Sequence, residues 1–101
     1  LRTAFATVTA SGALPANAIR VLLANAAANI TITLPDPALN IGRELLFTRS
    51  TASTGTVTLA PAAGQVQTLA GTFGATTTIT ALGNSDSQSV HFWSDGINWY
   101  R

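Results

Sequence analysis

The stretch Ile30-Thr31-Ile32-Thr33-Leu34 decides the fold, because apolar and polar residues alternate along it with a period of two. Successive side chains of a β-strand point to opposite faces of a sheet, so this pattern predicts a strand with one buried side. The same alternation occurs at Ile19–Leu23, Val57–Leu59 and Thr78–Leu82. Threonine, valine and isoleucine fill most of these positions, and all three favour strands.

Clusters of glycine, proline and asparagine interrupt these stretches at short intervals, for example at Gly12–Pro15, Pro35–Gly42 and Gly71–Gly74. Short strands separated by such turns are typical of all-β folds. We therefore expect a compact antiparallel β-sandwich or prism-like domain of about seven or eight short strands. A brief helical turn is expected near Pro37–Asn40, where proline begins a short segment between two strands.

The chain divides into two predicted parts. Residues 1–16 are mostly small and rich in threonine and alanine, which predicts an extended N-terminal arm or a linking strand. Residues 17–101 contain the alternating stretches and form the predicted β domain.

A β-hairpin is predicted at the C-terminus, where Asp95-Gly96 separates strands over Ser87–Ser94 and Ile97–Arg101. Asp-Gly suits a two-residue type I′ turn, which pairs Ser94 with Ile97. Both faces of this hairpin carry aromatic residues, so we expect it to lie between the core and a partner. The predicted faces are Val90, Phe92, Ile97 and Trp99 on one side, and His91, Trp93, Asn98 and Tyr100 on the other.

Charge is unusually sparse, because charged residues make up 9% of the chain whereas soluble domains carry about 25%. The net charge of +1 is spread over arginines without any lysine, which argues against nucleic-acid binding. The chain has no cysteine, which excludes disulfides, thiol catalysis and zinc–thiolate sites. No apolar run approaches the length of a membrane span, so we expect no membrane insertion.

A surface with so few charges is expected to be covered in part by other subunits. Arginine suits partly desolvated contacts with carboxylates, since its planar guanidinium donates in pairs. The residues predicted to lie in an oligomer interface are Arg43, Leu46, Arg49, Trp93 and Tyr100.

The inventory of reactive side chains predicts that the protein is not an enzyme and holds no cofactor. The single histidine, His91, lies three positions from Ser94 on one strand, so the two side chains point to opposite faces. Asp36, Asp86 and Asp95 adjoin turn signals and are expected to bond local backbone N–H groups. An ion held by His91 or by an aspartate near a three-fold axis between subunits is the one metal site left open.

Two interpretations remain open for His91, Trp93, Asn98 and Tyr100. Flat aromatic rings beside an amide can stack on a sugar and bond its hydroxyls, and the same rings are enriched in subunit interfaces. We favour the interface. The Thr-x-Thr stretches also allow an ice-binding array, but without a fixed repeat period solvated strand faces explain them better.

Five stretches of the sequence, taken in order, carry a resemblance over residues 18–101. They are Ile30-Thr-Ile-Thr-Leu-Pro35, Asn40-Ile-Gly-Arg-Glu-Leu-Leu-Phe47, Gly55-Thr-Val-Thr-Leu59, Gln67-Thr-Leu-Ala-Gly71 and Ser94-Asp-Gly-Ile-Asn-Trp-Tyr100. Together they resemble a small β domain of bacteriophage virion proteins, found in tail fibres, tail spikes, and head fibres or decoration proteins. The third strand of such domains often carries lysines, and Arg43 and Arg49 occupy that region here.

The resemblance implies a structural, non-enzymatic homotrimer on the surface of the virion. We therefore expect a tail-fibre or spike module, or a capsid decoration or head-fibre protein, that acts by multivalent attachment. Its implied partners are copies of itself, other virion proteins and a host surface glycan. The alternative is a carbohydrate-binding adhesin module that uses the aromatic hairpin face.

Overall fold

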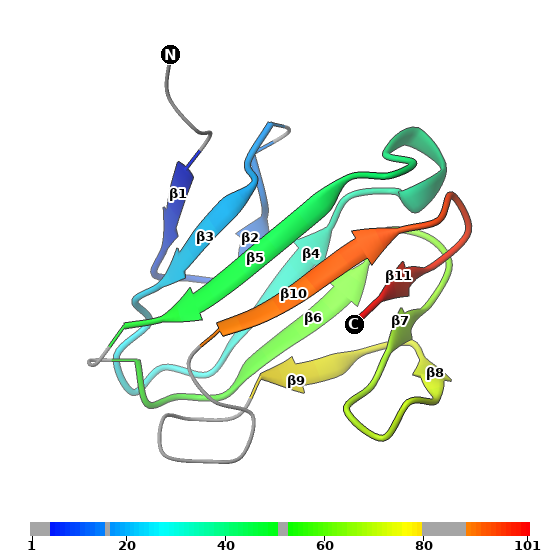
Figure 1. The fold of residues 1–101 in the computed structure, drawn as a ribbon. Coiled ribbons are helices and arrows are strands. Elements are labelled where there is room, and N and C mark those ends of the chain that lie inside the picture. Colours follow the sequence, from blue (N-terminus) through cyan, green and yellow to red (C-terminus); the bar gives the residue numbers. More distant parts are fainter. Residues whose placement is uncertain (1–4, 16, 51–52, 80–88) are drawn as a thin grey trace.

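The computed structural model describes residues 5–15, 17–50, 53–79 and 89–101, and these form an all-β fold (Figure 1). A single 3-10 turn, η1 (Pro37–Leu39), interrupts the strands. None of the described residues belongs to a helix long and apolar enough to cross a bilayer. The strands are β1 (Phe5–Val8), β2 (Gly12–Ala13), β3 (Arg20–Leu23), β4 (Ile30–Leu34), β5 (Glu44–Arg49), β6 (Val57–Pro61), β7 (Val66–Gln67), β8 (Phe73–Gly74), β9 (Thr77–Ile79), β10 (Ser89–Ser94) and β11 (Trp99–Tyr100).

The strands form two sheets, and the chain passes from one sheet to the other as it proceeds (Figure 1). A seven-stranded sheet has the order β1-β3-β5-β10-β11-β7-β8, and a four-stranded sheet has the order β2-β4-β6-β9. The pairs β1–β3–β5 and β2–β4–β6 are parallel. The first six strands therefore form three successive coils, β1–β2, β3–β4 and β5–β6, and each coil contributes one strand to each sheet.

The expectation of mostly antiparallel strands is wrong, because the sheets are mixed. Parallel neighbours need a crossover between them, and here the strand of the opposite sheet provides it. Phe5 pairs with Arg20 and Arg20 with Leu46, so the successive coils differ in length and leave no fixed repeat in the sequence. The strand count exceeds seven or eight because β2, β7, β8 and β11 are only two residues long.

One core lies between the two sheets and receives side chains from both of them. The alternation predicted from sequence is confirmed, since Ile30, Ile32 and Leu34 are buried along β4. Ile19 is an exception, because it precedes β3 and is exposed. Phe47 and Phe92 meet edge to face in this core, with ring centroids 5.8 Å apart.

The expected helical turn is confirmed as η1, which follows Asp36. The Asp36 carboxylate accepts a hydrogen bond from the Ala38 amide at 2.9 Å, as a residue at the N-terminal cap of a helix does. Ser94 on β10 donates its hydroxyl to the Pro37 carbonyl at 2.9 Å. This contact joins the turn to the C-terminal hairpin.

The C-terminal hairpin forms, but its predicted register is wrong. Ser94 pairs with Trp99 and Trp93 with Tyr100, so the connection is a four-residue loop over 95–98. The register differs from the prediction by two positions, and an even shift leaves each side chain on its predicted face. Trp99 therefore remains in the core, whereas Ile97 moves into the loop and is 70% exposed.

A close backbone approach around Gly55 generates the first test of this packing. A Cβ on Gly55 would lie 1.9 Å from the Ala28 carbonyl oxygen, whereas one on Gly74 would meet nothing closer than 3.6 Å. We expect Gly55→Ala to lower the free energy of unfolding by about 1–3 kcal/mol, because the backbone has to move. Gly74→Ala is the matched control, and equal midpoints in urea for the two variants would contradict the packing described.

Candidate binding face

Three aromatic side chains, which we call the aromatic cluster, gather on the outer face of the seven-stranded sheet, the side turned away from the core. They are Trp93 on β10, Tyr100 on β11 and Phe73 on β8. The rings of Trp93 and Tyr100 stack with centroids 4.7 Å apart and an interplanar angle of 19°. Phe73 packs against Tyr100 at 5.1 Å, nearly perpendicular to it.

Trp93 and Phe73, which is 37% exposed, are the members of the aromatic cluster that are available to a partner. Tyr100 contacts both other rings and is partly buried, whereas the Trp93 side chain is 40% exposed. On the side of Trp93 away from Tyr100, the ladder with β5 places Glu44. A ligand or a second subunit on this face therefore meets an indole ring beside a carboxylate.

The hairpin loop fixes the position of the Tyr100 ring. The Asp95 carboxylate accepts hydrogen bonds of 2.9 Å from the amides of Ile97 and Asn98. These backbone bonds lower the pKa of Asp95 below its ordinary value. The Tyr100 hydroxyl also donates to this carboxylate, which raises the pKa of Tyr100. The prediction that Asp36 and Asp95 act as turn residues is confirmed, and Asp86 lies outside the described residues.

Polar and charged side chains adjoin the aromatic cluster on the same face. His91 Nε2 lies 3.1 Å from a carboxylate oxygen of Glu44. Arg20, Leu46 and His91 form one cross-strand row over β3, β5 and β10. A shallow hollow of about 180 Å³ opens at this row, lined by Ile19, Arg20, Glu44, Leu46 and His91. Sequence reasoning did not place Glu44 and Arg20 on one face with His91, because only the strand order brings these residues together.

The structure brings together His91, Trp93, Tyr100 and Leu46 of the predicted site residues on the outer face. Asn98 lies in the hairpin loop instead, where its side-chain oxygen accepts from the Gln65 amide at 2.9 Å. Arg43 donates to the side chain of Asn40 and to the Ala18 carbonyl. Its contacts therefore join the segment before β3 to the segment before β5.

Arg49 lies in the interior, with 2% of its surface exposed. Its guanidinium donates to the carbonyls of Ile79 at 2.9 Å and Ser53 at 3.1 Å, and also to that of Gly55. The side chain satisfies carbonyls of segments that would otherwise be buried without partners. Because the guanidinium is committed to the inside of the protomer, we remove Arg49 from the candidate interface.

The described residues hold no cluster of three or more His, Cys, Asp or Glu side chains that suits a metal ion. His91 is exposed on the outer face, whereas Ser94 is buried and bonded to Pro37. The two side chains lie on opposite sides of the sheet, as the sequence predicts. This arrangement cannot pass a proton from the serine hydroxyl to the imidazole.

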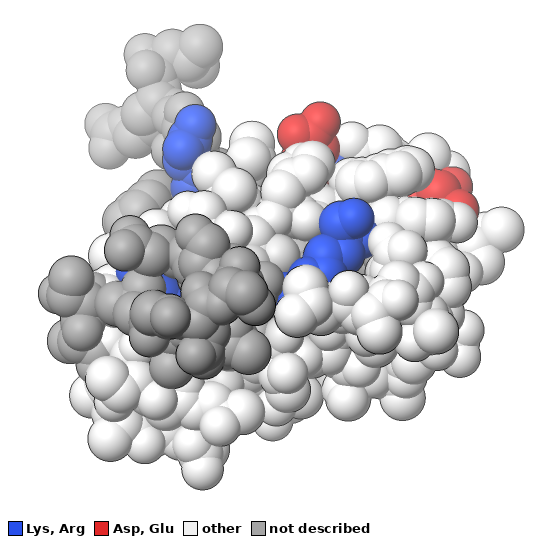
Figure 2. Space-filling model, turned by 60° about the horizontal axis from the view of Figure 1, so that its bottom comes forward, with Lys and Arg blue, Asp and Glu red and all other residues white. Residues whose placement is uncertain are grey.

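Charged groups are few on the surface in view in Figure 2, where arginine and acidic side chains form small separate patches. Most of that surface belongs to uncharged residues. The low charge of the composition therefore produces a surface that other uncharged surfaces can approach at little electrostatic cost.

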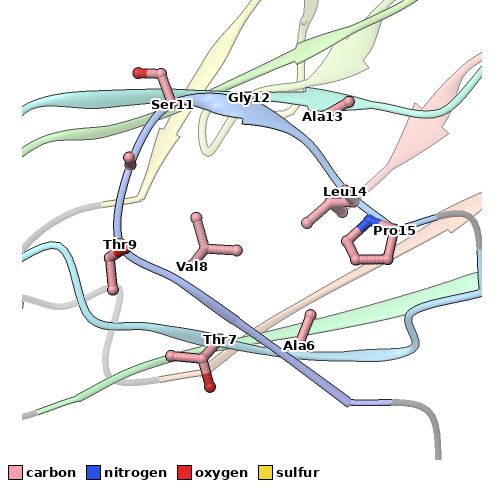
Figure 3. A pocket seen from close by; sticks show the side chains of 10 residues that line it. Ala6, Thr7, Val8, Thr9, Ser11, Gly12, Ala13, Leu14 and Pro15 are labelled. Atoms are coloured by element: carbon pink, nitrogen blue, oxygen red, sulfur yellow. The ribbon is translucent and has the colours of Figure 1, made fainter.

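A larger hollow, of about 310 Å³, opens at the end of the molecule formed by the first coil. Its lining consists of ten consecutive residues from Ala6 to Pro15, which include parts of β1 and β2. Val8 and Leu14 point toward the space between the two segments (Figure 3). Both side chains are partly buried and pack against the core cluster.

Comparison with known proteins gives no match: no family model, no curated protein and no solved structure is similar to this chain.

The buried contacts of Arg49 generate a second test. Replacing Arg49 by methionine keeps the apolar stem but leaves three carbonyls without their donor. We expect Arg49→Met to lower the free energy of unfolding by about 3 kcal/mol or more, since each unpaired buried group costs about 1–3 kcal/mol. The control is Arg20→Met on the exposed side of β3. Urea denaturation measures both, and similar losses in the two variants would refute the internal role of Arg49.

The hairpin loop generates a prediction for acid conditions. Because folding lowers the pKa of Asp95 below 3.8, its contribution is present above that pH and is lost as the pH falls through the lowered value. We expect Asp95→Asn to melt below the wild type at pH 7 and the difference in Tm to shrink toward pH 2. A constant difference over this range would contradict a charge-dependent loop.

Proposed function

We propose that this chain is a non-catalytic attachment module and a structural component of a bacteriophage virion surface. It serves in a tail fibre or spike, or as a capsid decoration or head-fibre protein. The resemblance over residues 18–101 supports this assignment. An all-β fold with one shared core and mixed sheets also suits a rigid particle component.

In this proposal the two sheets form a sandwich or prism-like body that assembles as a homotrimer through its outer aromatic face. The observation that carries the proposal is the position of Trp93, which is 40% exposed on a face that also presents Tyr100 and Leu46. Tryptophan and tyrosine are enriched in interfaces because they bury a large apolar area and retain a polar group. Burying this face also accounts for the low charge of the protein.

Attachment then rests on multivalency. Three copies on one axis present each weak contact three times, and the second and third contacts form at a high effective concentration. Other virion proteins and a host surface glycan are the partners that such an assembly would bind. The proposed location is the outside of the particle.

A second candidate is a carbohydrate-binding adhesin module. It is favoured by the open side of Trp93 next to Glu44, with the hollow of about 180 Å³ nearby. A sugar stacked on the indole would find hydrogen-bonding groups in Glu44 and His91, which lie 3.1 Å apart. This candidate uses the same face as the proposed trimer. The adhesin module requires that the face is free to bind a sugar, whereas the trimer requires that the face is buried between subunits.

The two functions are separated by the variant Trp93→Ala, with Leu69→Ala as the control because Leu69 is 60% exposed in the loop between β7 and β8 and is not a member of the aromatic cluster. Light scattering should give a mass of at least three times 10.4 kDa for the wild type and for Leu69→Ala. We expect Trp93→Ala to lose the trimer, because each contact between subunits loses about 1–3 kcal/mol of the free energy that burial of the indole provides.

A glycan array run on the same three proteins completes the experiment. Sugar binding by the wild type that Trp93→Ala abolishes while the mass is unchanged would replace the interface by the adhesin module. A wild type that remains a monomer at millimolar concentration would overturn the trimer.

A further inference from the structure

The first coil leaves both sheets open at the same end of the molecule. β1 is the terminal strand of the seven-stranded sheet and β2 is the terminal strand of the four-stranded sheet. Both are contributed by one short segment, and both lie at the left in Figure 1. A terminal strand presents a row of backbone N–H and C=O groups that the sheet itself does not pair.

The hollow between these two strands is the open end of the core. Its lining from Ala6 to Pro15 contains alanine, threonine, valine, serine, glycine, leucine and proline and has no ionisable side chain. Val8 and Leu14 reach inward from it to the core cluster. Stacked coils of this kind require a polar cap or another coil at their ends, because each coil buries its apolar side against the next.

The opposite edges of the two sheets differ from this end. Arg101 donates to the Thr77 hydroxyl at 3.1 Å and to the Thr78 carbonyl at 3.3 Å, and thereby covers part of the edge of β9. β8, the other terminal strand, is two residues long like β2, but its Phe73 packs against Tyr100 in the aromatic cluster. In the part of the chain that the structure describes, β1 and β2 carry neither a charged residue nor a proline, which are the usual protections of an exposed edge.

We propose that this end binds the same end of a second copy of the chain, with β1 pairing antiparallel to its counterpart across a two-fold axis perpendicular to the sheets. A single extended peptide can continue only one of the two sheets. The first coil of a copy has the same separation between its strands, so it continues both sheets at once.

The chemistry of the two surfaces also fits. Because residues 5–15 are uncharged, two copies meet without repulsion between like charges and without burying a charge. Each copy closes the hollow of the other over Val8 and Leu14. The contact lies at the sheet edges and does not use the aromatic cluster, so it is separate from the proposed trimer. It would join two monomers, or two trimers if the trimer forms.

Spin labels attached to single cysteines test this contact cleanly, because the chain has no cysteine of its own. Thr7→Cys places a label on the exposed side of β1, and Thr78→Cys is the matched control on β9. Paired β1 strands would hold the two labelled backbones within roughly 15 Å for any register, given a strand spacing of about 4.8 Å and about 3.4 Å per residue. Double electron–electron resonance at millimolar protein measures this distance.

A short distance for the Thr7→Cys label and none for the Thr78→Cys label supports the proposal. Adding Val8→Lys should abolish the short distance, since it places a charge in the closed hollow. No short distance at Thr7, or one that survives Val8→Lys with the fold intact by circular dichroism, overturns the contact. Light scattering on the Val8→Lys protein, in which the end contact is blocked, reports the trimer alone, so failure of one proposal is distinguishable from failure of the other.

Discussion

The fold depends on one shared core that is filled from both sheets as the chain passes between them. Along the chain, two strands that pair in parallel are always separated by a strand of the other sheet. Neither sheet can therefore form without the other. Leu23 and Leu34 come from the second coil and Leu59 from the third, and all three are fully buried in this core. Because the area that any one short strand buries is small, the coils stabilise each other only when stacked.

Buried polar contacts close this core where apolar side chains cannot. Arg49 supplies donors to the carbonyls of Ser53, Gly55 and Ile79, and the Trp99 indole donates to the Pro35 carbonyl at 2.9 Å. Irregular segments next to a core carry backbone groups that need partners. Among the described residues Arg49 is the one buried charged side chain, so the low charge of the surface follows from the small number of charged residues in the composition.

The sequence predicts which side of each strand is buried but not the direction in which strands pair. Alternation along β4 locates Ile30, Ile32 and Leu34 correctly, since it depends only on the side-chain period. Parallel pairing depends on coils of unequal length, which leave no repeat. The predicted outer position of Trp93 and Tyr100 is correct although the predicted register is wrong, because a shift by two positions leaves each of them on the same face. The interior role of Arg49 and the pairing of Glu44 with His91 depend on long-range contacts and carry no local signal.

The central claim is that copies of the chain cover the outer aromatic face. Trp99 is fully buried in the protomer, whereas Trp93 is 40% exposed, so iodide quenching of tryptophan fluorescence reports almost entirely on Trp93. The account predicts that the emission resists iodide at high protein concentration and that a quenchable fraction grows on dilution. Quenching of the same fraction at every concentration would show that Trp93 faces water throughout and would contradict the claim.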